Sequence, residues 1–552
     1  MAHVEHYRQI AETLARHGFG FAIGVAGLQN WVPLHRGLIG HESREEPYSN
    51  PEHLRLALEQ LGPTYIKLGQ ILSTRPDLLP APYRSELAKL QDSAPPVPGP
   101  VIADLIEREL GDVPSQVFAS FDLEPLASAS LGQAHAATLH DGTDVVVKVR
   151  RPRIVEQVEQ DLEVLRNLAI RADRRWEAAA DYDLVGIAEE FADTLRAEVD
   201  YVHEGRNAER FAANFAASQT IRIPQIYWDT TTSRVLTIER ISGIKVNDLA
   251  ALDAAGIERR VLADNAAQAI AKMIFEDGFF HADPHPGNLF VQSDGRIGLI
   301  DFGMVGEVDE ALREALSRLL IALAGRDPRR VALAVIELTS SRTTVNISAL
   351  ATDLAPILER YTERALVDVP VGALIQDVLA VVRQHHLRLP RGLALLSKML
   401  VMAEGLGTEL DPQFQLSQVI GPYARRLVAS RYSPEGIVRQ LRRAGVDVLD
   451  VVAELPVQLR RMRDMLDAGG PEVHLRTAEL EPFIDRLEAT GRQLQAAVLT
   501  AAVIRTVGDI VIADPRRRRS RTFSLLAAAL GATGAVGAYR ALTLGPRRNK
   551  RK

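Results

Sequence analysis

The chain has 552 residues, of which 46% are hydrophobic and 25% charged, with a net charge of -6. This length predicts about two to four domains, and the charge gives no reason to expect a nucleic-acid partner. Because the chain contains no cysteine, disulfides, thiolate metal sites and cysteine nucleophiles are excluded. The first residues lack the basic-then-apolar order of a signal peptide, so we expect the catalytic part to be cytoplasmic.

The N-terminal part is predicted to be helical, from about residue 52 to residue 90. It ends in a linker, DSAPPVPGP, which carries four prolines. A β-hairpin is expected next, because the turn pair Asp141-Gly142 separates AHAATLH from the β-branched run DVVVKV. Lys148 lies on the second strand of this hairpin.

The rest of the chain is predicted to be mainly helical. Apolar residues recur at helical spacing after the hairpin, a second helical block covers about residues 184–215, and RVLTIERISG is a further strand. Short strand pairs are expected around LFVQSDGRIGLIDFG, and helices follow them. A small sheet followed by helices is typical of the α+β class.

The stretch HADPHPGN, from His281 to Asn288, brings chemically active groups together in a short loop. Asp283 and Asn288 are followed by Asp301 in LIDFG, an order found in protein kinases, where the first Asp orients the attacking hydroxyl and the other two groups bind magnesium. Lys148, on a strand upstream, has the place of the phosphate-binding lysine. These matches in the correct order predict a phosphoryl-transfer site, whose transition state needs charge neutralisation and alignment.

A metal-dependent hydrolase is the alternative interpretation of the same loop, with His281, Asp283 and His285 as ligands. It needs a further ligand from elsewhere in the chain and leaves Asn288 and Asp301 unexplained. We therefore favour phosphoryl transfer. His281 is expected to brace the loop, and His285 could either contact phosphate or cap a turn.

Several features depart from protein kinases. The loop that would cover the phosphates reads LASASLGQ, where Gly132 is the only glycine, so the backbone has less freedom to wrap around phosphates. The arginine and lysine of the usual catalytic loop are replaced by Ala282 and His285. No Ala-Pro-Glu segment follows Gly303, so we do not expect a peptide substrate.

The C-terminal end predicts a membrane anchor. From Thr522 the sequence runs uncharged to Tyr539, and with Arg540 tolerated the apolar run reaches Leu544. As a helix it would span roughly 27 to 35 Å, close to the hydrocarbon thickness of a bilayer. Basic clusters on both sides, RRRRSR and PRRNKRK, suit anionic headgroups. We expect a transmembrane helix that holds the protein at the cytoplasmic face of the membrane.

Taken together, these motifs resemble the UbiB (AarF) family of atypical protein-kinase-like proteins. GPTYIKLGQILSTRPDLLP is similar to the family's KxGQ helix, LASASLGQAH to its alanine-rich loop, and EVDYVHEGRNAERF to its ExD motif. HADPHPGNLF, LIDFG and the LDP at residues 410–412 complete the resemblance, which covers roughly residues 54–412.

The resemblance implies a two-lobed, protein-kinase-like α+β fold with added helices at both ends. The expected parts are a helical N-terminal extension (1–118), a kinase-like N-lobe (119–242), a kinase-like helical C-lobe (243–420), a C-terminal helical region (421–515) and a basic-flanked transmembrane tail (516–552).

Roles for individual residues also follow from the resemblance. Lys148 would contact the phosphates and pair with Glu204, and Asp283 would be the catalytic acid of the loop. Catalytic roles are implied for Asp283, Lys148, Glu204, Lys67 and Gln70. Nucleotide-binding roles are implied for Ala127, Ser128, Ala129, Ser130, Lys148, Glu198, Asp200 and Glu239. Asn288 and Asp301 would bind magnesium.

Lys67 and Gln70 would fold over the site and meet the acids of the ExD motif, Glu198 and Asp200. On an unbroken helix those two acids lie about 200° apart, whereas Asp200 and Glu204 share a face. Either the helix is distorted there or the two acids have different partners.

Family membership implies ATP binding, magnesium dependence and ATPase activity linked to isoprenoid quinone biosynthesis at membranes. The leading hypothesis is ATP-driven work on a lipid intermediate or on quinone-biosynthesis enzymes, with membrane lipids as partners. A small-molecule or lipid kinase is the second hypothesis. A membrane scaffold that binds ATP without turnover is the third.

Overall fold

The structure is a computed structural model. It describes residues 2–18, 49–75, 77–90, 94–175, 183–341, 345–362 and 370–431. All of these belong to the first of two compact units into which the chain divides, Met1–Arg439. Within these ranges no helix is both long and apolar enough to cross a membrane. The predicted transmembrane tail, 516–552, and nearly all of the predicted C-terminal helical region lie outside the described residues.

The N-terminal extension is helical. Its α3 begins at a capping box formed by Ser49 and Glu52, and Gly62, with a φ of 105°, separates α3 from α4. The helices α3, α4 and α5 pack against one another around a core that includes Leu58, Tyr65 and Leu87. The helices are α1 (Ala2–Arg16), α3 (Asn50–Leu61), α4 (Pro63–Ser73), α5 (Ala81–Leu87), α6 (Gly99–Leu110) and α7 (Pro114–Val117).

An antiparallel sheet follows, in the order β1-β2-β3-β5. Its strands are β1 (Ser120–Ser128), β2 (Gly132–Thr138), β3 (Asp144–Arg150) and β5 (Val235–Glu239). Along β3, Val145, Val147 and Val149 are buried against α6 and its neighbours. Because side chains alternate along a strand, Lys148 lies on the opposite face, in register with Ala134 of β2 and Leu236 of β5.

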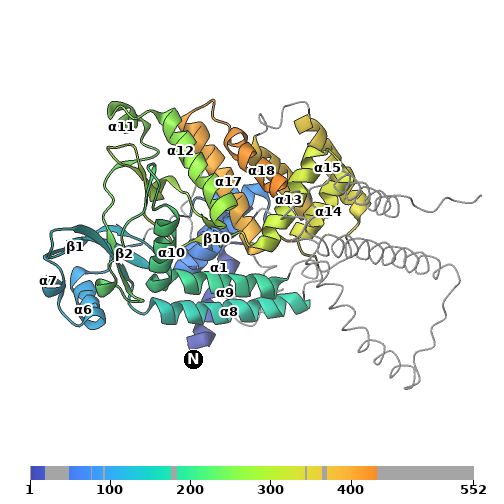
Figure 1. Ribbon diagram of the computed structural model, residues 1–552. Helices are drawn as coiled ribbons and strands as arrows, with labels where there is room; N and C mark the ends of the chain where they lie inside the picture. The colour runs from blue at the N-terminus through green and yellow to red at the C-terminus, as the bar shows by residue number, and fades with distance from the viewer. Residues whose placement is uncertain are drawn as a thin grey trace, which may run out of the picture. The chain divides into compact units, whose positions relative to one another are not determined.

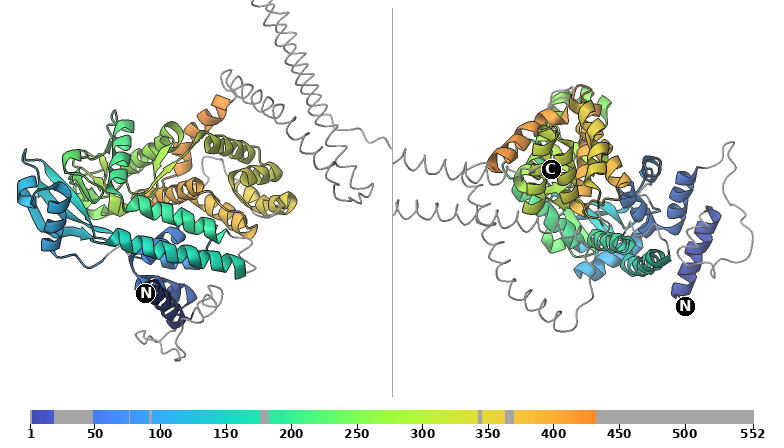
Figure 2. Two further views of the ribbon diagram at one scale, coloured as in Figure 1. Left: turned by 90° about the horizontal axis from the view of Figure 1, so that it is seen from below. Right: turned by 90° about the vertical axis from the view of Figure 1, so that its right-hand side faces the viewer.

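Three helices lie between β3 and β5, where the sequence predicted helical blocks. They are α8 (Ile154–Arg175), α9 (Leu184–Glu198) and α10 (Tyr201–Asn214). Figure 1 shows α8 and α9 side by side, and the same pair of teal helices is adjacent again in Figure 2. The short β4 (Ile221–Arg222) and the 3-10 turn η3 (Trp228–Thr230) lead back to β5.

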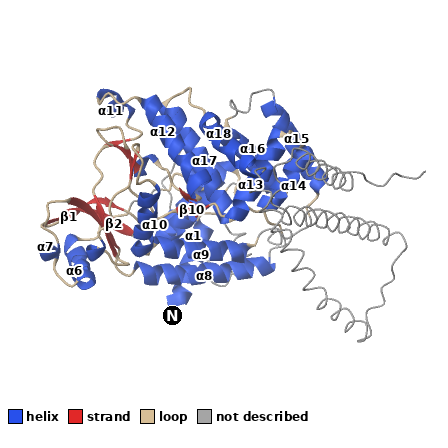
Figure 3. Ribbon diagram, viewed as in Figure 1, coloured by secondary structure: helices blue, strands red, loops and turns tan. Residues whose placement is uncertain are grey.

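The remaining described residues form the helical C-lobe, and Figure 3 shows how few strands it contains. Its sheet has the order β4-β9-β8-β6, and β10 pairs with β7. Its elements are β6 (Ile244–Lys245), α11 (Leu249–Ala254), α12 (Arg259–Lys272), the π-helical turn η4 (Met273–Asp277), β7 (Phe279–His281), η5 (Pro286–Asn288), β8 (Leu289–Val291), β9 (Ile297–Leu299), β10 (Val305–Glu307), α13 (Glu310–Ala324), α14 (Pro328–Leu338), α15 (Ile347–Thr362), α16 (Val371–Gln384), α17 (Arg391–Leu410) and α18 (Leu416–Arg431).

A continuous apolar core joins α10 to the C-lobe. Phe302 of the Asp-Phe-Gly motif is buried, with its ring centroid 5.5 Å from that of Phe211 on α10 and 5.9 Å from the ring of His281. The helix that carries Glu204, the loop that carries Asp283 and the motif that carries Asp301 are therefore packed on common side chains. The architecture is kinase-like, with mixed helices and strands.

Candidate functional site

Lys148 of β3 is the centre of an ion-pair network. Its Nζ lies 2.5 Å from Oε1 of Glu204 on α10 and 3.8 Å from Oδ2 of Asp301. The same oxygen of Glu204 accepts a hydrogen bond from the Phe302 N–H at 3.4 Å. Glu204 thus connects the lysine to the Asp-Phe-Gly motif, the combination that a kinase-like site requires for catalysis.

The two acids of the ExD motif have different partners, because the helix is interrupted between them. α9 ends at Glu198, and Asp200 caps the start of α10 by accepting the Val202 N–H at 3.0 Å. Glu198 instead lies 3.2 Å from Lys67 of α4. Both explanations offered for the two acids are therefore correct: the helix is interrupted between them, and they have different partners.

Gln70 does not contact the ExD acids as the resemblance implied. Its side-chain amide donates to the carbonyl of Leu90 at 3.2 Å. Although the two motif residues lie one helical turn apart on α4, Lys67 meets Glu198 at the end of α9 while Gln70 fastens the helix to the segment after α5. Its observed contact is structural.

The loop that follows β7 holds Asp283 between an imidazole and an ammonium. Nδ1 of the buried His281 accepts the Asp283 N–H at 3.2 Å, and its Nε2 contacts the carbonyl of Asp301. The ring therefore braces both loops. Oδ1 of Asp283 accepts a hydrogen bond from Nζ of Lys398, on α17, at 2.7 Å.

His285 caps a turn. Its Nδ1 accepts the Gly287 N–H at 3.0 Å, at the start of the 3-10 turn η5. The turn-capping role is therefore observed, and a phosphate contact through the other ring nitrogen stays a prediction. In the described part of the chain, no group of three or more His, Cys, Asp or Glu side chains is arranged to hold a metal ion.

The electrostatics favour ionised Asp301 and Asp283 and a charged Lys148, whereas burial raises the pKa of Glu204 despite its contact with the lysine. Burial alone would raise the pKa of Asp301, but Lys148 and the Gly303 N–H outweigh it and lower that pKa to about 2. Burial also opposes ionisation of Asp283, yet Lys398 brings its pKa below the usual value. Burial by itself would lower the pKa of Lys148, and the carboxylates of Asp301 and Glu204 raise it above its usual value.

Asp301 and Asn288 offer the ligand types that Mg²⁺ prefers. The Asp301 side chain keeps 47% of its surface exposed despite its contact with Lys148. The amide nitrogen of Asn288 donates to the carbonyl of Asp283 at 3.2 Å, so the amide oxygen would be the atom that meets a metal. A carboxylate and an amide oxygen, completed by water and phosphate oxygens, fit a Mg²⁺ site. When bound there, the metal would supply positive charge to the phosphates of a nucleotide.

The predicted nucleotide loop is a short turn fastened by its neighbours. The Ala129 N–H donates to the carbonyl of Gly132 at 2.8 Å, closing the turn between β1 and β2. Arg151 donates to the carbonyl of Ala129 at 2.8 Å, to Oγ of Ser128 at 2.9 Å and to the carbonyl of Pro95 at 2.7 Å. The proline linker is thereby tied to the loop. Ala127 lies on β1, and Ser130 is buried.

Gly132 allows two other segments to approach this turn closely. A Cβ at this position would lie 2.9 Å from the carbonyl oxygen of Val149 and would collide with the hydroxyl of Tyr201, next to the ExD motif. We expect Gly132→Ala to lower the free energy of unfolding by about 1–3 kcal/mol, because overpacking displaces backbone here. Urea denaturation measures this change.

Gly405→Ala is the matched control for that variant. Gly405 lies within α17, and an added Cβ meets nothing within 4 Å, so alanine should stabilise the helix by about 0.5–1 kcal/mol. Equal unfolding energies for the two variants would contradict the close approach at Gly132.

Glu239, predicted to bind nucleotide, has its carboxylate committed to structure. It accepts two hydrogen bonds from Nη2 of Arg222, at 2.6 and 2.8 Å, and one from the Gln225 N–H at 3.1 Å. The side chain ties the end of β5 to β4. A nucleotide contact through this carboxylate would compete with three existing hydrogen bonds.

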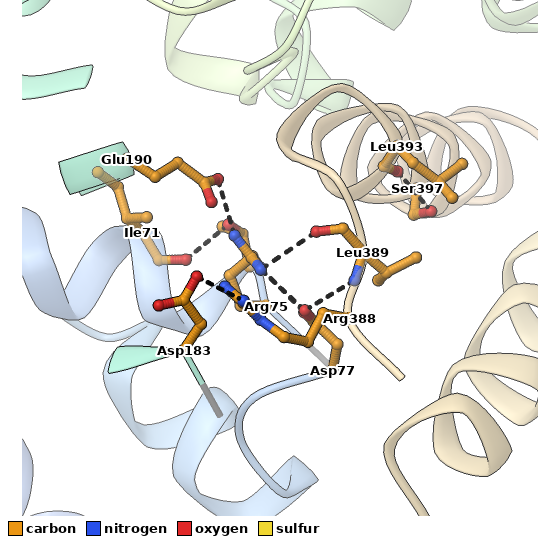
Figure 4. Close-up of polar contacts among 10 residues, drawn as sticks. Ile71, Arg75, Asp77, Asp183, Glu190, Arg388, Leu389, Leu393 and Ser397 are labelled. Carbon is orange, nitrogen blue, oxygen red and sulfur yellow. Dashed lines mark hydrogen bonds and ion pairs between the residues drawn. The ribbon is translucent and has the colours of Figure 1, made fainter. Parts of the chain in front are cut away.

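The extension is fastened to the C-lobe by a group that we call the extension clamp: Arg75, Asp77, Glu190 and Leu389 (Figure 4). Arg75 forms a two-point ion pair with Asp77, at 2.9 and 2.8 Å, and a further contact with Glu190 at 2.8 Å. Arg75 also donates to the carbonyl of Leu389, whose N–H donates to Asp77, both at 3.3 Å. The side chains of Arg75 and Asp77 are 5% and 0% exposed.

Sequence reasoning missed Lys398, Arg151 and the extension clamp. Lys398 and Arg151 act on partners that lie far away in the chain. The Arg75–Asp77 pair of the clamp, although it lies within the KxGQ-like stretch, meets Glu190 and Leu389 only through the fold. Only Lys398 has a signal in the sequence, because it is the single charged residue between Arg391 and Glu404 in a largely apolar helix.

Comparison with known proteins gives consistent matches over most of the chain. Residues 89–335 match the ABC1 atypical kinase-like domain, and residues 354–415 match the UbiB helical domain. A probable protein kinase UbiB of Xanthomonas oryzae pv. oryzae is 34% identical over 89% of this chain and 90% of its own length. The protein of the same name from Xylella fastidiosa is 35% identical over 81% and 82%.

A further relative and a solved structure are also similar to this chain. The protein sll1770 of Synechocystis is 34% identical over 82% of this chain and 78% of its own length. A solved structure of Rv3197 with erythromycin, from Mycobacterium tuberculosis, has a TM-score of 0.46 and 24% identity, covering 67% of this chain and 93% of that one. So low a TM-score does not by itself establish a shared fold. With matches to both domain models and relatives of this identity and coverage, the chain belongs to the UbiB family of ABC1 atypical kinase-like proteins.

Proposed function

We propose that this protein is a membrane-associated, atypical kinase-like ATPase that binds Mg²⁺-ATP and supports isoprenoid quinone biosynthesis or the handling of a lipid intermediate. The observation that carries the nucleotide part is the network in which Lys148 contacts both Glu204 and Asp301. Asp283 and Asn288 lie on one loop beside it, joined by a hydrogen bond. These are the groups that phosphoryl transfer needs, because they position the phosphates and neutralise charge.

The segments around this network support ATP turnover without a protein substrate, because they offer no site on which a peptide could dock. After Gly303 the chain passes through β10 directly into α13, which begins at Glu310. Between these points there is no long activation segment on which a peptide could dock. The extension is also bound beside the site, through Lys67 and Glu198. The acceptor would therefore be water or a small or lipid molecule.

The membrane part of the proposal rests on sequence. The apolar segment near the C-terminus, with its basic flanks, would hold the protein at the cytoplasmic face of the membrane. Membrane lipids and quinone-biosynthesis enzymes would be its partners, and nucleic acid would not. The isoprenoid quinone assignment follows from the family alone.

The fate of the terminal phosphate tests the proposal. The full chain is reconstituted in anionic or neutral liposomes with Mg²⁺ and ATP labelled on its γ-phosphate, and free phosphate and lipid-bound label are measured together. We expect free phosphate, released faster in anionic liposomes, and no labelled lipid. Label on a lipid-soluble product would instead make the protein a lipid kinase. Tight ATP binding without any release of phosphate would make it a scaffold.

A further inference from the structure

The loop that carries Asp283 provides no cation of its own for the transferred phosphate. Ala282 and the two prolines are uncharged, and Nδ1 of His285 accepts the Gly287 N–H, so this nitrogen is an acceptor and does not donate to phosphate. In phosphoryl transfer the charge of the moving group is spread over three oxygens, and positive groups beside the catalytic acid stabilise it. Besides Lys148 and Mg²⁺, a cation from another part of the chain would supply such charge beside Asp283.

Lys398 is placed to be that cation. It projects from α17 of the C-lobe, its side chain is 14% exposed, and its Nζ lies 2.7 Å from Oδ1 of Asp283. A lysine ammonium is a compact charge with three N–H donors on a flexible stem. Asp283 takes one donor, so others can meet phosphate oxygens without the pair being broken.

The start of α17 is held firmly. Leu389, two residues before the helix, is bound through both its N–H and its carbonyl by the extension clamp. Figure 4 shows this contact beside the first turns of the helix, where Ser397 donates to the carbonyl of Leu393 at 2.8 Å. Lys398 follows Ser397 on the same helix, so the clamp holds the start of the helix that carries the lysine.

We propose that Lys398 is a catalytic residue of the phosphoryl transfer: its ammonium binds the terminal phosphate of ATP while it holds the Asp283 carboxylate. It thus supplies from α17 the charge that the loop lacks. This rests on the proposed function, since it presupposes that ATP binds beside Asp283.

The experiment compares Mg²⁺-ATP with Mg²⁺-ADP in calorimetric titrations of the full chain, for the wild type, Lys398→Met and Lys398→Arg. Only ATP has the phosphate that Lys398 would contact. We expect Lys398→Met to weaken ATP binding roughly 10- to 100-fold, the effect of losing a charge-assisted hydrogen bond, and to leave ADP binding unchanged. Lys398→Arg should keep most of the preference for ATP because it keeps the charge.

Lys272→Met is the matched control. Lys272 also forms an ion pair within the C-lobe, 2.6 Å from Asp277, and should leave the affinities for both nucleotides unchanged. Turnover adds a second measurement. Because Lys398 and Asp283 would act as a unit, the loss of kcat in the Lys398→Met, Asp283→Asn double variant should be smaller than the product of the single losses.

Each other outcome overturns the inference. An unchanged ratio of ATP to ADP affinity in a folded Lys398→Met variant would show that the lysine does not contact the terminal phosphate, while the proposed function would stand. Equal weakening for both nucleotides would assign Lys398 a structural role. If Lys398→Met does not fold, Lys398→Gln, which also removes the charge, takes its place, and an unchanged ratio of ATP to ADP affinity in that variant decides against the proposal. If the wild type bound neither nucleotide, the proposed function itself would be wrong.

Discussion

Asp283→Asn should reduce the kcat for ATP turnover by about 10²- to 10⁴-fold, the usual contribution of a positioned acid or base. The amide keeps the size of the side chain, so the His281 contact to the backbone of residue 283 should persist. Mg²⁺-ATP affinity should change little, since Lys148, Asn288 and Asp301 are untouched. Steady-state phosphate release and calorimetry give the two quantities separately.

Asp294→Asn is the control for this substitution. Asp294 is an acid of the same size on an exposed turn between β8 and β9, where it pairs with Arg296 at 2.6 Å. Turnover in this variant should equal that of the wild type. If Asp283→Asn also turned over ATP at the wild-type rate, Asp283 would not be the catalytic acid.

Asp77→Ala should lower the free energy of unfolding by about 3–5 kcal/mol, because it leaves the guanidinium of Arg75 buried without its main partner. The Asp77 side chain is fully buried and accepts from both Arg75 and the N–H of Leu389. Urea denaturation of the full chain measures the loss. Because the clamp also fixes the start of α17, turnover at a temperature where the variant is folded should fall as well.

The control for the clamp is an exposed ion pair of similar geometry. Arg166 and Glu189 lie 2.5 Å apart with side chains 59% and 44% exposed, so Glu189→Ala should change the unfolding energy by no more than about 1 kcal/mol. An equally small effect for Asp77→Ala would mean that the clamp does not hold the extension.

The parts of the site that could be predicted from sequence are those encoded in short stretches. Asp283 and Asn288 lie on one loop, and the alternation of DVVVKV places Lys148 on the face away from the valine core. The pairing of Lys148 with Glu204 could be predicted although the two residues lie far apart in the chain, because the motif around Glu204 was recognised as a unit. These stretches therefore predict which groups form the site and which strands and helices carry them.

The rest depends on how distant segments pack. Gln70 was assigned to the ExD acids because it follows Lys67 in the same motif, but the close packing of α4 on the end of the extension turns it toward Leu90. Glu239 was assigned to the nucleotide, and no sequence signal indicated that Arg222, at the end of β4, binds its carboxylate. Lys398 could not be paired with Asp283 before the C-lobe helices were placed.

The central claim is that ATP binds at this site through a Mg²⁺ ion held by Asp301 and Asn288. The most direct measurement is calorimetric titration of the full-length wild type with ATP, in excess Mg²⁺ and in EDTA, with Asp301→Asn alongside. We expect tight binding only for the wild type with Mg²⁺, and a large loss of affinity in EDTA and in the variant. Absence of ATP binding to the wild type in Mg²⁺, or equal affinity under all three conditions, would contradict the claim.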